Sequence, residues 1–111
     1  MKINKETQEK IQELQLIEQN LQNLLMQKQA FQMELNEVEN ALSEVSKTTG
    51  EIYKIVGQVM IRGEKSEIEK DLKEKNDILS LRVKSIEKQE NSFSEKVEKL
   101  RAQVTEEIKK G

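Results

Sequence analysis

Two long stretches of heptad-spaced apolar residues, separated by a short segment that holds most of the glycines, constrain this chain more than any other feature. The chain has no proline, and three of its four glycines lie between Gly50 and Gly63. Because helix breakers are confined to the middle, each flanking stretch is free to form an uninterrupted helix. We therefore expect one mainly α domain over 1–111, with a helix over about 5–47, a β-hairpin over about 51–62 and a helix over about 66–109.

The first helical stretch carries apolar residues at alternating steps of three and four, the spacing of a coiled-coil seam. One seam position, Lys28, is polar. A lone polar seam residue can fix the register of a coiled coil, while a lysine can also bury its stem and extend its ammonium group into water. The sequence leaves both readings open. The seam comprises Leu14, Ile17, Leu21, Leu24, Lys28, Phe31, Leu35, Val38, Leu42 and Val45.

The second helical stretch opens with Ser66 and Glu69, spaced as a capping box, and has a weaker seam. Its main apolar residues leave Lys75, Arg82 and Gln89 at the intervening positions, and towards its end the spacing changes to steps of four, three and four. Such a change resembles a stutter, which unwinds a coiled coil locally. The expected seam residues are Ile68, Leu72, Leu79, Ile86, Phe93, Val97, Leu100, Val104 and Ile108.

The two helical stretches have similar lengths, and the connector between them is short. The second helix can therefore fold back antiparallel on the first, which would place Phe31 near Arg82. The connector is rich in β-branched residues on both sides of Gly57, and a glycine there can supply the positive φ of a tight turn. The sequence thus predicts an antiparallel two-helix coiled coil with a central β-hairpin.

The predicted hairpin is apolar on both faces, so two helices at one of its ends cannot cover it. An isolated two-stranded hairpin is marginally stable, and exposed apolar strands favour pairing with other chains. We expect it to join hairpins of neighbouring subunits in an intersubunit β-barrel, the alternative being a hairpin folded down on its own helices. The expected faces are Tyr53, Ile55, Val59 and Ile61 on one side and Ile52, Val56 and Met60 on the other.

Composition excludes several classes of function. The net charge is −2, with 19 basic and 21 acidic residues interleaved along the chain, so no basic patch for nucleic acid is present. No apolar run is long enough for a membrane span, and we expect a soluble, cytoplasmic protein. The chain has no histidine or cysteine, which excludes thiolate metal sites, and its carboxylates are expected on solvated helix faces where nothing would shift their pKa towards acid–base catalysis. We expect no enzymatic activity and no cofactor.

The segment Ile52–Ile61 reads Ile-Tyr-Lys-Ile-Val-Gly-Gln-Val-Met-Ile. It resembles the hairpin of the β-class prefoldin subunits, in which a Tyr-Lys pair is followed by aliphatic residues, a glycine and a second aliphatic strand. The segment Leu81–Glu90 is similar to archaeal members in particular. The resemblance covers nearly the whole chain, with Met60 and Lys28 as departures from the family pattern.

This resemblance implies a hexamer of two α-class and four β-class subunits, in which the hairpins form a double β-barrel and the coiled coils project from it. It also implies an ATP-independent holding chaperone that captures unfolded proteins at the coiled-coil tips and delivers them to a group II chaperonin. The alternative is a structural adaptor that oligomerises through its hairpin and bridges two specific partners. An adaptor would not suppress the aggregation of unrelated proteins.

The ends of the two helices are the expected client-binding tips. Thr7 and Lys10 stand where apolar seam residues belong, so some apolar surface should stay open there or open easily, although chain ends also fray without any function. Leu25, Met26 and Met33, outside the seam, form a second candidate surface. The expected client-binding residues are Ile3, Ile11, Leu14, Leu16, Leu100, Val104 and Ile108.

Overall fold

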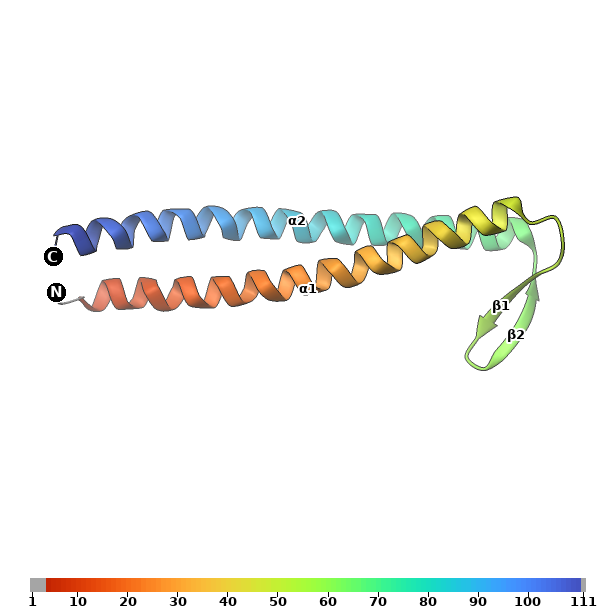
Figure 1. Cartoon of the computed structure of the whole chain (residues 1–111), viewed down its shortest axis with the longest axis horizontal. Coiled ribbons are helices and arrows are strands. Elements are labelled where there is room, and N and C mark those ends of the chain that lie inside the picture. Colours follow the sequence, from red (N-terminus) through yellow and green to blue (C-terminus); the bar gives the residue numbers. More distant parts are fainter. Residues whose placement is uncertain (1–3, 111) are drawn as a thin grey trace. The chain divides into compact units, whose positions relative to one another are not determined.

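The computed structural model describes residues 4–110, which form two helices with a β-hairpin between them (Figure 1). The elements are α1 (Lys5–Lys47), β1 (Ile52–Val56), β2 (Val59–Gly63) and α2 (Lys65–Lys110). The predicted fold class, mainly α with antiparallel helices and a central hairpin, is confirmed. Within these residues no helix has a stretch long and apolar enough to cross a membrane.

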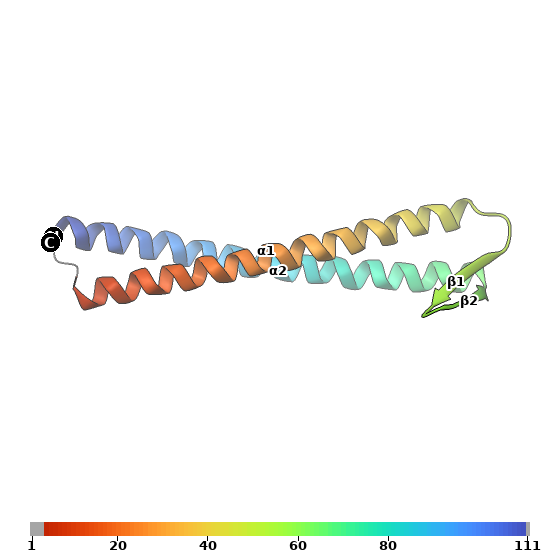
Figure 2. The same ribbon diagram turned by 60° about the horizontal axis from the view of Figure 1, so that its bottom comes forward.

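The chain divides into two compact units. The terminal unit comprises Met1–Gln29 and Lys84–Gly111, and the hairpin unit comprises Ala30–Val83. In the terminal unit the first turns of α1 lie beside the last turns of α2, in both views of the ribbon (Figures 1 and 2). In the hairpin unit the last part of α1 and the first part of α2 run antiparallel, and the strands connect them. The expected proximity of Phe31 and Arg82 is confirmed there, since the guanidinium carbon lies 5.5 Å from the ring centroid.

The seam of α2 differs from the predicted one in its phase. Lys75, Arg82 and Gln89 are all exposed, whereas the next residue along the chain in each case, Asn76, Val83 or Glu90, is buried or half-buried. With these positions included, steps of four and three continue without interruption, so the predicted stutter is absent. The inward-facing residues of α2 are Leu72, Asn76, Leu79, Val83, Ile86, Glu90, Phe93, Val97, Leu100, Val104 and Glu107.

Local capping groups set the ends of the helices. Asn4 is the N-cap of α1: its Oδ1 accepts a hydrogen bond of 2.8 Å from the Thr7 backbone N–H. At the other end of α1, Thr48 Oγ1 donates to the Glu44 carbonyl at 2.8 Å. α2 begins at Lys65, so Ser66 lies within its first turn instead of capping it. The N-cap position is Glu64, whose carbonyl accepts the first helical hydrogen bond, so the predicted capping box starts two residues too late.

The hairpin has a two-residue turn, Gly57-Gln58, with Val56 opposite Val59 and Ile55 opposite Met60. Gly57 has a φ of 63° and no other residue type adopts positive φ among the described residues, which is the pattern of a type II′ turn. Because paired residues share a face, the predicted division of the faces is wrong. One face carries Ile52, Lys54, Val56, Val59 and Ile61, and the other carries Tyr53, Ile55, Met60 and Arg62.

Candidate functional site

The hairpin presents both of its faces to solvent. Ile55 on one face is 72% exposed and Val59 on the other is 59% exposed. Tyr53, Val56, Met60 and Ile61 are exposed as well, and Ile52 is half-buried. The sheet contains these two strands alone among the described residues, so both of its edges lack backbone partners. This hairpin is the largest collection of exposed apolar side chains on neighbouring positions in the hairpin unit.

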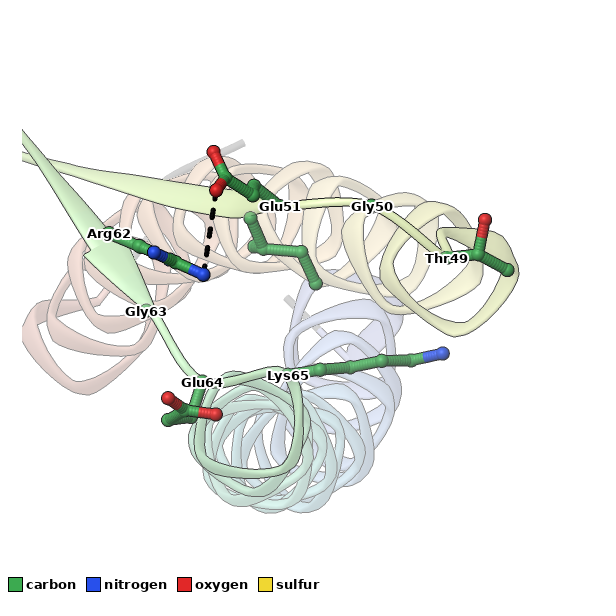
Figure 3. Close-up of a pocket in the computed structure, with 8 residues that line it drawn as sticks. Thr49, Gly50, Glu51, Arg62, Gly63, Glu64 and Lys65 are labelled. Atoms are coloured by element: carbon green, nitrogen blue, oxygen red, sulfur yellow. Dashed lines mark ion pairs between the residues drawn. The ribbon is translucent and has the colours of Figure 1, made fainter.

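A polar pocket of about 340 Å³ lies where the strands join the helices (Figure 3). An ion pair of 3.5 Å between Arg62 and Glu51 ties the beginning of β1 to the end of β2. Lys65 donates from Nζ to the Ser46 and Thr48 carbonyls, each at 3.1 Å, and so satisfies the last turn of α1. The pocket residues connect the strands to the helix ends, and the side chains that line the pocket do not form a catalytic set.

Gly63 allows the second strand to approach α2 closely. A Cβ at this position would lie 2.5 Å from Ile68 Cδ1 and 3.1 Å from its Cγ1. Any larger residue would displace Ile68, which is half-buried in the first turn of α2. The hairpin therefore leaves the helices in a direction that this contact helps to define.

The expected client-binding residues have different environments in the terminal unit. Leu16 is exposed, at 59%. Val104, at 9% exposure, is buried in the seam and can meet a client only if the helices separate. Ile3 lies outside the described residues. The half-buried members of the set are Ile11, Leu14, Leu100 and Ile108.

A polar network closes the seam in the terminal unit. Thr7, at 2% exposure, is the buried polar residue among those described. Its Oγ1 lies 2.5 Å from Glu107 Oε2 and 2.8 Å from Asn4 Oδ1. The other carboxylate oxygen of Glu107 accepts a hydrogen bond from Lys10 Nζ. Thr7 and Lys10, two of the polar residues in the seam of α1, are thus held by one carboxylate of α2.

This network shifts the pKa values of its charged members. The pKa of the Glu107 carboxyl lies below its ordinary value of 4.5 because Lys10, and then Thr7, donates hydrogen bonds to the carboxylate. The pKa of Lys10 is raised by the same hydrogen bond. Glu107 therefore stabilises the closed helix ends above its unfolded-state pKa, and this contribution is lost as the pH falls through its folded-state value. The Lys10 contribution is lost as the pH rises through the raised pKa.

In an NMR titration of the glutamate carboxyl carbons, we expect Glu107 to titrate below its ordinary value. Lys10→Met should raise the pKa of Glu107 towards that value because it removes the main hydrogen-bond donor. Lys28→Met is the matched control: it removes an equal charge about 27 Å away along α1 and should leave the Glu107 titration unchanged. Equal shifts in the two variants would contradict a local network.

Lys28 has a partner within the seam. Its Nζ lies 2.8 Å from Glu90 Oε1, and both side chains are mostly buried. The pKa of Lys28 is raised by this hydrogen bond. Its ammonium group is thus held by Glu90 instead of extending freely into water, and a register-fixing role is favoured over a snorkelling one.

Sequence reasoning missed two acidic seam residues and two exposed apolar residues. Glu90 and Glu107 could have been found as the acidic residues at matching distances from Lys28 and Lys10, since one antiparallel register aligns both pairs. Ile78 and Leu81, at 51% and 66% exposure, are three residues apart on the outer face of α2. Of the second candidate surface, Leu25, Met26 and Met33 are all exposed as expected.

Known proteins match this chain over nearly its whole length. The family model described as prefoldin subunit matches residues 8–111. Prefoldin subunit beta of Methanospirillum hungatei is 37% identical over 108 residues, which cover 96% of this chain and 90% of the relative. The crystal structure of the prefoldin beta subunit from Thermococcus strain KS-1 superposes with a TM-score of 0.89 at 33% identity, covering 95% of this chain and 94% of that one.

Proposed function

The chain belongs to the family of prefoldin β-class subunits, and from this premise we propose that it captures unfolded proteins without ATP and delivers them to a group II chaperonin. Family membership makes it a non-enzymatic chaperone subunit that assembles with other prefoldin subunits. The observation that carries the proposal is the similarity over nearly the whole chain, hairpin included. Its place of action would be the cytoplasm.

The assembly we propose is a hexamer of two α-class and four β-class subunits. Its support is the hairpin, whose two faces are apolar and exposed in the isolated subunit. Neighbouring hairpins that extend the sheet on both edges would satisfy the free backbone groups, and closure into a barrel would bury the face of each hairpin that points inward. A closed barrel would leave no edge unpaired.

We place client capture on the terminal unit. Leu16 is already exposed there, and the half-buried Ile11, Leu14, Leu100 and Ile108 surround the polar end of the seam. Each such contact is weak by itself. Several copies on one assembly raise the effective concentration of binding sites, which allows a client to be held by weak individual contacts. Varied apolar side chains also suit clients of unrelated sequence.

The test is light scattering by at least three unrelated denatured proteins in the presence of the full assembly. We expect aggregation to be suppressed for each of them, whereas a structural adaptor would protect none. Deletion of residues 1–12 together with 103–111 should retain the oligomer and lose much of the protection, because it removes Ile3, Ile11, Val104 and Ile108 from the expected client-binding residues.

A pair of single variants tests whether an exposed leucine contributes to protection only when it lies in the terminal unit. Leu16→Gln lies in the terminal unit, and Leu81→Gln makes the same change at a similarly exposed position of the hairpin unit. We expect the first to weaken protection and the second to leave it unchanged. If the truncated assembly protected clients as well as the full-length one, the tip would be excluded as the capture site, and Leu25, Met26 and Met33 would replace it.

A further inference from the structure

The last layers of the seam in the terminal unit are polar, in contrast to the apolar layers that precede them. Thr7 and Lys10 face inward from α1, and Glu107 faces them from α2. Next to them lie Leu14 of α1 and Leu100 and Val104 of α2, which are half-buried or buried. Opening this end of the coiled coil would therefore expose apolar side chains that the polar layer now covers.

Among the described residues, Glu107 makes the hydrogen bonds that join the first two turns of α1 to α2. The Thr7 hydroxyl has a single proton and two acceptors in reach, Asn4 Oδ1 and Glu107 Oε2. Asn4 Oδ1 already accepts the Thr7 backbone N–H, and a carboxylate is the stronger acceptor, so the hydroxyl proton is assigned to Glu107. The same carboxylate accepts from Lys10. Loss of Glu107 would leave both α1 residues without their partner on α2.

We propose that Glu107 is a latch: its bonds to Thr7 and Lys10 hold the helix ends together, and their release exposes the apolar residues that bind clients. The gating part of this inference rests on the proposed holding function. Such a latch can open readily, because the side chains of Lys10 and Glu107 are about one-quarter exposed and water competes for the bond between them. Fixed closure would need an apolar layer, which the sequence does not provide at Thr7 and Lys10.

The Lys28–Glu90 pair provides a comparison within the same unit. It joins the same residue types across the same two helices, with similar exposure. Leu24 and Ile86, however, are buried in neighbouring layers and hold the helices together around it. Breaking this pair removes an interaction without freeing an end. Glu90→Ala is therefore a matched control for Glu107→Ala, since both remove one carboxylate and change the net charge equally.

Hydrogen exchange of the assembled protein tests the latch without any client. We expect Glu107→Ala to accelerate exchange of the amides near Ile11 and Leu100 by about three- to tenfold, as the ends open more often. Glu90→Ala should leave those amides close to the wild-type rate. Equal exchange in the two variants would overturn the latch.

A reversible cross-link that locks the helix ends together tests whether their opening is required for client binding. The chain has no cysteine, so Thr7→Cys with Glu107→Cys can be joined specifically by a short, reducible bis-methanethiosulfonate linker. The locked assembly should lose most client protection and regain it after reduction, while Glu107→Ala should protect at a lower assembly-to-client ratio than wild type. Protection by the locked form equal to that of the reduced form would overturn gating. If no form protected any client, the holding function and its gating would both fall, while the exchange result would still decide the latch.

Discussion

Replacement of both Ile55 and Val59 by aspartate is expected to abolish assembly while leaving the helices intact. The register places the two residues on opposite faces of the hairpin, so the double variant introduces a charge on each. Fully burying an aliphatic side chain contributes about 1.5–3 kcal/mol, and an unpaired carboxylate in the same place is strongly unfavourable. Because every copy of this chain in the assembly carries the change, the loss accumulates over its hairpin contacts.

Sedimentation velocity should show the double variant as monomer or dimer, with helical circular dichroism largely retained. The single variants Ile55→Asp and Val59→Asp test one face each. Gln58→Asp is their control, since it adds the same charge in the turn, outside both strands. A double variant that still formed the full oligomer would refute the barrel arrangement, and an effect from one single variant alone would mean that only that face is covered.

Leu79→Ala is expected to be the most destabilising truncation of a leucine in the seam. Leu79 is 2% exposed, the most buried apolar residue among those described. A leucine-to-alanine change at such a site destabilises by about 2–5 kcal/mol, because the transfer free energy is lost and a cavity remains. Alanine is also a good helix former, so the loss is one of packing and not of helix propensity.

Leu81→Ala is the control, because it makes the identical change two residues away at a side chain that is 66% exposed. We expect it to change the free energy of unfolding by no more than about 0.5 kcal/mol. Urea unfolding followed by circular dichroism measures both, at one fixed subunit concentration, because assembly contributes to the apparent stability. Similar midpoints for the two variants would mean that the seam of α2 is not as described.

The difference between these two leucines also shows where sequence reasoning reached its limit on α2. Leu79 was correctly placed in the seam, but the positions between the main apolar residues were assigned to Lys75, Arg82 and Gln89. Leu72, Leu79 and Ile86 recur every seven residues and mark one seam position of each heptad. The second seam position can lie either three or four residues later, and both choices are compatible with a heptad. The apolar spacing alone favours neither seam, because Asn76 and Glu90 occupy two of the three true intervening positions. The partner helix decides, because Glu90 is stabilised in the seam by Lys28.

In the hairpin, too, the sequence was enough to predict the elements but not the position of each side chain. Two β-branched runs around Gly57 were enough to predict two strands and a tight turn, because glycine alone readily adopts the positive φ that is observed. The assignment of residues to faces needed the length of the turn. With two residues in the turn, Val56 pairs with Val59, and a turn longer or shorter by one residue would move every side chain of one strand to the opposite face.

The sequence by itself determined the two long helices, the strands between them and the family, since these depend on helix breakers, heptad spacing and a short local motif. Only the tertiary structure decided which polar residues of the seam meet, as Lys28 does with Glu90 and Lys10 does with Glu107. It also decided that Val104 is buried while Leu16 is exposed. The physical reason is that periodicity describes one helix at a time, whereas burial and ion pairing depend on the register of two helices, which residues distant in the chain set together.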